Sequence, residues 1–128
     1  MGLFSFKKSP SKGAQLSWLE TVDAAYAKAF AIKNVAGLEE YFTRTCLSKL
    51  MQRVRLGEKA YSGLARYQHT SWVKVADNGE TMQFKKTVTY DQIKMSQGIV
   101  ASVGEGYIEL WTVVKENGID KVSEIRRE

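Results

Sequence analysis

The apolar residues of this chain change their spacing near residue 60, and that change limits the possible folds more than any other feature. From about Gln15 to Leu56 they recur every three or four positions, as on one face of a helix. From Leu64 onward they recur at every second position, as in strands with one buried face. Helices followed by alternating strands predict an α+β domain, with N-terminal helices packed on a twisted antiparallel sheet of about four strands.

The helical part divides into three segments. A helix over 15–33 is predicted by one apolar stripe, formed by Leu19, Val22, Tyr26 and Phe30. A short helix is expected over 38–42. A third is expected over 44–56, where Leu47, Leu50, Met51 and Val54 share a face and Gly57 can end the helix.

The sequence Asp77-Asn78-Gly79 lies between two alternating runs and predicts a β-hairpin. A two-residue turn at Asn78 and Gly79 would need positive φ at both residues and would fix the pairing of the strands. The predicted pairs on the helix-facing side are Val75/Met82, Val73/Phe84, Ser71/Lys86, His69/Val88 and Tyr67/Tyr90. The other face would be almost wholly polar, apart from Trp72.

Two further strands are expected near the C-terminus, over 107–115 and 121–127, joined by a turn at Asn117-Gly118. The alternation of the third strand separates Ile108, Leu110 and Val114 from a second set, expected on the outer face, that includes Tyr107, Glu109 and Trp111. The register of the last hairpin stays open, because short and longer loops both give mixed faces. The glycine-containing stretch 96–106 is expected to be a loop or a bulged connection.

Length and composition indicate one globular domain. The chain has 128 residues, of which 44% are hydrophobic and 26% charged. Residues 1–14 lack an apolar period and contain three lysines and the only proline, so we expect a flexible basic tail before a single domain over 15–128. The one cysteine cannot form an internal disulfide, no apolar run is long enough to span a membrane, and no secretory signal is seen. A cytoplasmic location is expected.

The net charge of +5 is concentrated in two places. The tail carries three lysines and no acid, and residues 44–66 carry six basic residues against one acidic residue. One interpretation is contact with an anionic surface, such as a membrane, through Lys7, Lys8, Arg53 and Arg55. The alternative is that these residues form a solvated tail and the exposed face of a helix.

Two stretches resemble the NTF2-like superfamily, an α+β cone architecture, and within it the Tim44-like domains. Leu38-Glu-Glu-Tyr-Phe-Thr followed by Leu47-Ser-Lys-Leu is similar to the short helix that leads into the family's third helix. Glu109-Leu-Trp-Thr-Val-Val-Lys-Glu-Asn-Gly, followed by Val122-Ser-Glu-Ile-Arg, resembles the closing hairpin of Tim44-like domains. The tryptophan usual after that turn is replaced by Ile119-Asp120-Lys121. The resemblance implies a cone-shaped fold with a pocket, and dimers formed through the sheet.

Several kinds of chemistry are disfavoured by the residues present. One histidine and one cysteine cannot supply the three or four nitrogen and sulfur ligands of a zinc site, so no metal is expected. No Walker A loop or dinucleotide fingerprint occurs, so no cofactor is expected. No RNA-binding signature occurs, so no nucleic-acid partner is expected.

The predicted hairpin register gives one unusual group of residues. It places His69, Ser71 and Lys86 in adjacent pairs on the helix-facing side, where a lysine interrupts an apolar alternation. One interpretation is a pocket, lined by His69, Ser71, Lys86, Tyr67, Tyr90, Tyr26 and Phe30. The other is that Lys86 reaches solvent at the sheet edge and His69 is an ordinary core residue.

The leading hypothesis is a non-enzymatic binding or adaptor module that takes a small apolar ligand or a protein partner. Binding is favoured over catalysis because no carboxylate is expected on the pocket face. The alternative is a small isomerase, dehydratase or hydrolase that uses His69 and Lys86. A homodimer is expected through the outer sheet face, with Trp72, Trp111 and Tyr107 as its aromatic anchors.

Overall fold

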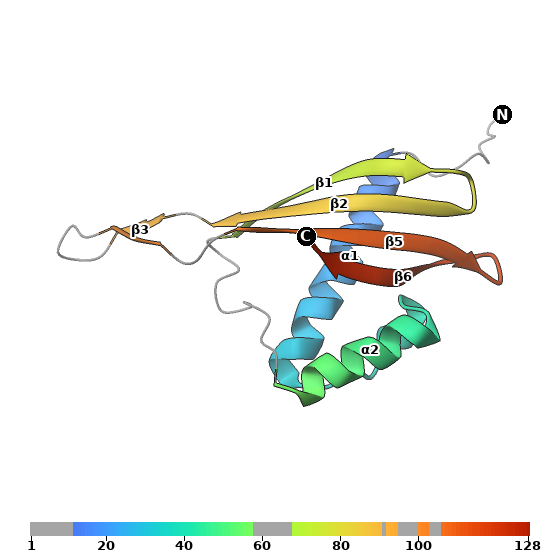
Figure 1. Cartoon of the computed structure of the whole chain (residues 1–128), viewed down its shortest axis with the longest axis horizontal. Coiled ribbons are helices and arrows are strands. Elements are labelled where there is room, and N and C mark those ends of the chain that lie inside the picture. The colour runs from blue at the N-terminus through green and yellow to red at the C-terminus, as the bar shows by residue number, and fades with distance from the viewer. Residues whose placement is uncertain (1–11, 58–67, 91, 95–99, 103–105) are drawn as a thin grey trace.

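The computed structural model describes residues 12–57, 68–90, 92–94, 100–102 and 106–128 (Figure 1). Its elements, in chain order, are α1 (Lys12–Ile32), the 3₁₀ helix η1 (Leu38–Glu40), α2 (Arg44–Arg55), β1 (Gln68–Asp77), β2 (Thr81–Tyr90), β3 (Gln92–Lys94), β4 (Val100–Ser102), β5 (Tyr107–Glu116) and β6 (Ile119–Arg127). The predicted α+β class is confirmed.

The four long strands form one antiparallel sheet in the order β1-β2-β5-β6. The short strands β3 and β4 pair separately, and of these two only β4 lies within the predicted loop stretch 96–106. Figure 1 shows α1 crossing behind the strands and α2 lying below the edge strand β6. The chain between η1 and α2 attaches to that edge, because Val122 accepts from the amide of Thr43 and donates to the carbonyl of Tyr41.

The helices form where the apolar stripes predicted them. Helix α1 begins at Lys12, three residues before the expected start, and buries Leu19, Val22, Tyr26 and Phe30. Helix α2 begins after Thr43, whose hydroxyl accepts from the amide of Cys46 at 3.3 Å, a typical N-cap bond.

The β1–β2 hairpin is present, but its predicted register is wrong. Asn78 and Gly79 do not form the two-residue turn; Asp77 pairs with Met82 across a longer loop. Side-chain oxygens of Asp77 and Asn78 accept from the amides of Gly79, Glu80 and Thr81, which stabilises this longer loop. A bulge at Val75 then shifts the pairing again, so Trp72, not Ser71, lies opposite Lys86.

The two-residue turn occurs in the last hairpin. Asn117 and Gly118 both have positive φ, 54° and 79°, and Glu116 pairs with Ile119. A register shift between Thr112 and Val113 leaves Ser123 as the extra residue in β6. This bulge explains why neither loop length gave clean faces from the sequence.

The core lies between the helices and the sheet face that they cover, and it is rich in aromatic rings. Trp111 is fully buried and makes edge contacts with Trp72 and Tyr26, at ring-centroid distances of 5.0 and 5.5 Å. Phe42 and Phe84 are buried in the same cluster. Among the described residues, Lys86 and Glu109 are the only charged ones that are almost fully buried, and Trp111 lies beside both.

Candidate functional site

Lys86 lies in the core between the helices and the sheet. It occupies an inward position of β2, between the buried residues Phe84 and Val88, and is 2% exposed. An ammonium group buried without a partner would strongly destabilise the fold, so the stability of this position depends on the groups that contact the Lys86 side chain.

Two carboxylates from different elements compensate the charge of Lys86. The Lys86 Nζ donates to Asp23 Oδ1 of α1 at 2.6 Å and lies 3.5 Å from Glu109 Oε1 of β5. Asp23 and Lys86 are 63 residues apart in sequence, so the pair ties the first helix to the centre of the sheet.

Glu109 is held by three neighbours. Its Oε1 accepts from Trp111 Nε1 at 3.1 Å, and its Oε2 lies 3.6 Å from a guanidinium nitrogen of Arg127 on β6. Because Lys86 is the third neighbour, the almost fully buried carboxylate is satisfied from both sides.

Aromatic rings enclose the Lys86 ammonium. Its Nζ lies 5.4–5.9 Å from four ring centroids, those of Tyr26, Trp72, Tyr107 and Trp111. These distances are within the range of cation–π attraction, which is stronger at a desolvated site than on the surface.

Burial also changes the titration of the neighbouring groups. Desolvation raises the pKa of Asp23 above its ordinary value, against the opposing attraction of Lys86 and with a smaller contribution from Glu109. Desolvation likewise raises the pKa of the Tyr26 hydroxyl, so this tyrosine stays protonated at neutral pH. A carboxylate with a raised pKa beside an ammonium is a feature of many functional sites, although structural ion pairs share it.

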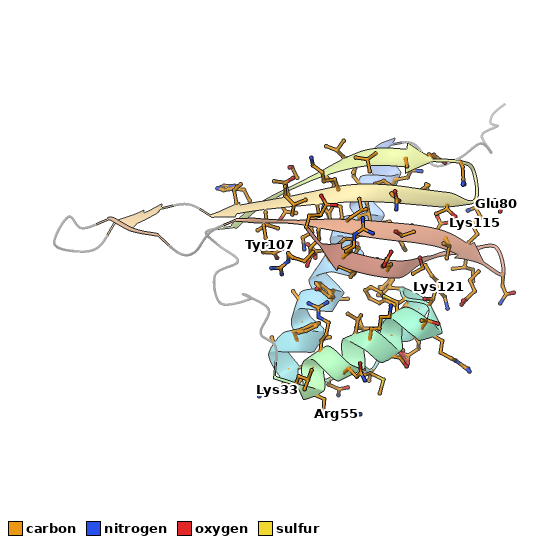
Figure 2. The ribbon with its side chains drawn as sticks, viewed as in Figure 1. Lys33, Arg55, Glu80, Tyr107, Lys115 and Lys121 are labelled. Carbon is orange, nitrogen blue, oxygen red and sulfur yellow. The ribbon has the colours of Figure 1, made fainter. Side chains whose placement is uncertain are left out.

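A hollow of about 350 Å³ opens beside this cluster, lined by Arg53 of α2 and by Glu109, Ile125 and Arg127 of the β5–β6 hairpin. The Arg53 guanidinium lies over the rings of Tyr26 and Phe30, at 5.9 and 5.0 Å. The Arg127 guanidinium lies over the Tyr107 ring, 4.0 Å from its centroid. Figure 2 shows Tyr107 at the end of the sheet that lies over the C-terminal ends of the helices, marked by Lys33 and Arg55.

A larger hollow, of about 460 Å³, lies between those helix ends, lined by Lys33, Asn34, Val35, Met51, Val54, Arg55 and Gly57. Neither of the buried charged residues reaches it. The smaller hollow joins a buried carboxylate to two arginines and is therefore the better candidate site.

The structure separates the predicted pocket residues. Lys86, Tyr26 and Phe30 are buried on the helix-facing side of the sheet, as expected. His69 and Ser71 are exposed on the outer face of β1, because the register differs from the prediction. The catalytic pairing of His69 with Lys86 is therefore wrong. Tyr67 and the side chain of Tyr90 lie outside the described residues.

The predicted interface residues also lie on the other side of the sheet. Trp111 is 0% and Trp72 9% exposed, and both belong to the core. Tyr107 is partly buried beside Lys86 and Arg127. The faces predicted for β5 are reversed, because the alternation does not show which side of the strand the helices cover. The homodimer itself stays a prediction.

The basic residues fall into different environments. Arg55 is exposed at the end of α2, whereas Arg53 is partly buried and lines the smaller hollow. Lys7 and Lys8 lie outside the described residues. Contact with an anionic surface stays a prediction.

Sequence reasoning missed Asp23 and Glu109, the two carboxylates of the site. Asp23 follows the buried Val22 but lies outside the apolar stripe of its helix, so the periodicity does not show that it faces the sheet. A signal was present: a lysine within the inward alternation of β2 requires a buried acid nearby, and Glu109 lies two positions before a buried tryptophan.

Neither a metal cluster nor a membrane span is found in the described part of the chain. No group of three or more histidine, cysteine, aspartate or glutamate side chains comes together there. No helix in that part combines the length and the apolar character needed to cross a bilayer.

Comparisons with known proteins support the fold and no more than the fold. No protein-family model matches the chain, and no curated protein sequence matches it. The solved structure of Aln2 from a Streptomyces species is similar over 94% of this chain and 94% of that chain, with a TM-score of 0.55 and 14% sequence identity. The chain therefore shares its overall α+β fold with Aln2.

Proposed function

We propose that this chain is a small-molecule-binding module whose site is the hollow formed by Arg53, Glu109, Ile125 and Arg127. The observation that carries the proposal is the almost fully buried Glu109, which lines the hollow and is held by Lys86, Trp111 and Arg127. A buried charge network is seldom the most stable way to fill a core, so its presence beside an open hollow supports a functional role.

We also infer that the architecture is NTF2-like. The order of helices and strands supports this: two helices and a short 3₁₀ turn precede an antiparallel sheet whose long strands follow one another as neighbours. The buried charged residues lie between the helices and the sheet, where a cone-shaped fold would have its pocket.

The test is a titration of the ¹⁵N-labelled chain with a library of small aromatic fragments. Chemical-shift changes at Arg53, Ile125 and Arg127 are the expected result. Ile125→Trp should fill the hollow and abolish them, whereas Ile119→Trp, at the exposed start of the same strand, should leave them unchanged. Fragment shifts that map to other surfaces, or an Ile125→Trp chain that binds normally, would refute the proposal.

Acid–base catalysis by the charge cluster behind this hollow is the second candidate, and Asp23, which pairs with Lys86, is the observation that favours it. Its carboxylate has a raised pKa and its side chain remains 18% exposed, so it could exchange a proton with a bound substrate. Bound fragments that are converted by the wild type but left intact by Asp23→Asn, as measured by mass spectrometry, would support it. Fragments that bind and are never converted would exclude catalysis for those compounds.

A further inference from the structure

We propose that the ligand of this hollow is a neutral molecule that donates one hydrogen bond to Glu109 Oε2 from an otherwise apolar body. The inference rests on the proposed function, because it names the chemical class bound at the same site.

The first argument is the uneven supply of hydrogen bonds to the Glu109 carboxylate. Its Oε1 accepts from Trp111 Nε1 at 3.1 Å. Its Oε2 lies 3.6 Å from a guanidinium nitrogen of Arg127, which is an ion-pair separation but too long for a hydrogen bond. No residue in the described part of the chain donates a hydrogen bond to Oε2. The charge of Glu109 is therefore compensated, while one of its oxygens still has the capacity to accept.

The second argument is where this oxygen lies. Glu109 is 2% exposed, and buried polar atoms are generally hydrogen-bonded to protein, water or a ligand. An ionised carboxylate is a stronger acceptor than a neutral group, so a donor that reaches Oε2 gains more there than at a carbonyl. Glu109 and Arg127 both line the hollow, so a bound molecule approaches the carboxylate on the side of Oε2.

The third argument is that Arg127 does not close this side. Its side chain is 53% exposed, so its contact with Oε2 is screened by water and weak. Its guanidinium also lies over the Tyr107 ring, 4.0 Å from the centroid, and this contact does not involve Glu109. A ligand donor can therefore bind Oε2 without displacing a buried partner.

The surrounding charges decide between a neutral and a charged donor. Arg53 and Arg127 line the hollow, and the Lys86 ammonium lies 3.5 Å from the other oxygen of Glu109. A cationic donor would be repelled by all three groups. An anionic group would bring acceptors to a carboxylate that itself needs a donor. A neutral N–H or O–H group meets neither difficulty.

The remaining lining indicates the rest of the ligand. Ile125 supplies an apolar side chain from β6. A volume of about 350 Å³ is at the lower end of the range for small-molecule sites. A phenol, an indole or a small aryl amide fits this description, with its ring against Ile125 and its donor at Glu109.

The experiment compares indole with benzofuran, which has the same bicyclic shape and an oxygen in place of the N–H group. Both are neutral, so added NaCl should change neither affinity by more than about twofold. Both are titrated into the ¹⁵N-labelled full chain at neutral pH, and affinities are taken from the amide shifts of Ile125 and Arg127. Indole should bind at least about tenfold more tightly, the factor expected from one hydrogen bond to a charged group.

A variant of the acceptor locates the contact. Glu109→Gln keeps the shape of the side chain and replaces the charged acceptor by a neutral one, so the preference for indole should fall below about threefold. The matched control is Glu116→Gln, which changes the carboxylate at the other end of β5, where it pairs with Lys121 outside the hollow. Its preference for indole should equal that of the wild type.

The outcomes separate the two proposals. If the two probes bind at the hollow with equal affinity, water is a sufficient partner for Oε2, and the donor class is refuted while the binding site survives. If Glu109→Gln keeps the full preference for indole, the assignment to Glu109 is wrong. If neither probe binds although other aromatic fragments shift Ile125 and Arg127, only the donor class is refuted. If no fragment shifts these residues, the proposed function fails and this inference fails with it. The comparison of the two probes in the wild type gives the decision should Glu109→Gln fail to fold.

Discussion

Replacing Lys86 by methionine should destabilise the fold strongly at neutral pH and less strongly in acid. The side chain is 2% exposed, and its removal leaves Asp23 without the 2.6 Å ion pair. The cheapest response is to protonate Asp23, which costs about 4 kcal/mol at pH 7 and about 1.5 kcal/mol at pH 5 for an ordinary pKa of about 3.9. Because Asp23 keeps some contact with water, we expect the free energy of unfolding to fall by somewhat less, about 3 kcal/mol at pH 7 and about 1 kcal/mol at pH 5.

The loss is smaller in acid because Asp23 can then be protonated at lower cost. In Lys86→Met the folded chain binds this proton more tightly than the unfolded chain, so its folded pKa is raised. Stability is then retained below the unfolded pKa and lost as the pH rises through the folded pKa. Urea unfolding followed by circular dichroism at the two pH values measures both losses.

Two variants serve as controls for Lys86→Met. Lys85→Met changes the neighbouring exposed lysine of β2 and should cost less than about 0.5 kcal/mol. Adding Asp23→Leu to Lys86→Met removes both members of the ion pair and should restore roughly half or more of the unfolding free energy lost in the single variant. A Lys86→Met chain within about 0.5 kcal/mol of the wild type at both pH values would show that the lysine is not buried against these carboxylates.

Three further predictions concern separate parts of the fold. Because burial raises the pKa of Asp23, the contribution of this group to stability is lost as the pH rises through its pKa in the folded chain. In Asp23→Asn the free energy of unfolding, measured with urea, should therefore change less between pH 4 and 7 than in the wild type. An equal pH dependence in both chains would contradict this. Gly106→Ala should lower the free energy of unfolding by about 1–3 kcal/mol in the same assay, because the added Cβ would lie 2.4 Å from the carbonyl oxygen of Val88. An unchanged stability would show that residue 106 and β2 are further apart. If the chain dimerises through the outer sheet face, Val73→Asp, at a residue 54% exposed there, should convert a wild-type dimer to a monomer in analytical ultracentrifugation; a wild-type monomer at tens of micromolar would refute the dimer.

The sequence predicted the elements well because each carries a strong local signal. The stripe that begins at Leu19, the glycine at 57 and the alternation of β2 locate the helices and strands to within a few residues. The inward position of Lys86 also followed from alternation alone, since β2 has no bulge.

The site depended on information that local patterns do not contain. The bulge at Val75 and the longer loop after Asp77 moved Trp72 inward and His69 outward, and both depend on how β1 fits β2 and the helices. For β5 the alternation grouped Glu109 with Trp111 correctly, but only the packing of the helices decides which face is the core. Asp23 was missed because its partner lies 63 residues away in sequence.

The most direct test of the account is the NMR signal of the Lys86 ammonium group. Ammonium protons of exposed lysines exchange rapidly with water, whereas a group buried between Asp23, Glu109 and four aromatic rings should exchange slowly. In the ¹⁵N-labelled chain at neutral pH we expect a protected lysine ¹⁵Nζ signal that disappears in Lys86→Met and remains in Lys85→Met. If Lys86 gives no protected signal, or if the signal survives in Lys86→Met, the buried charge cluster that defines the proposed site does not exist.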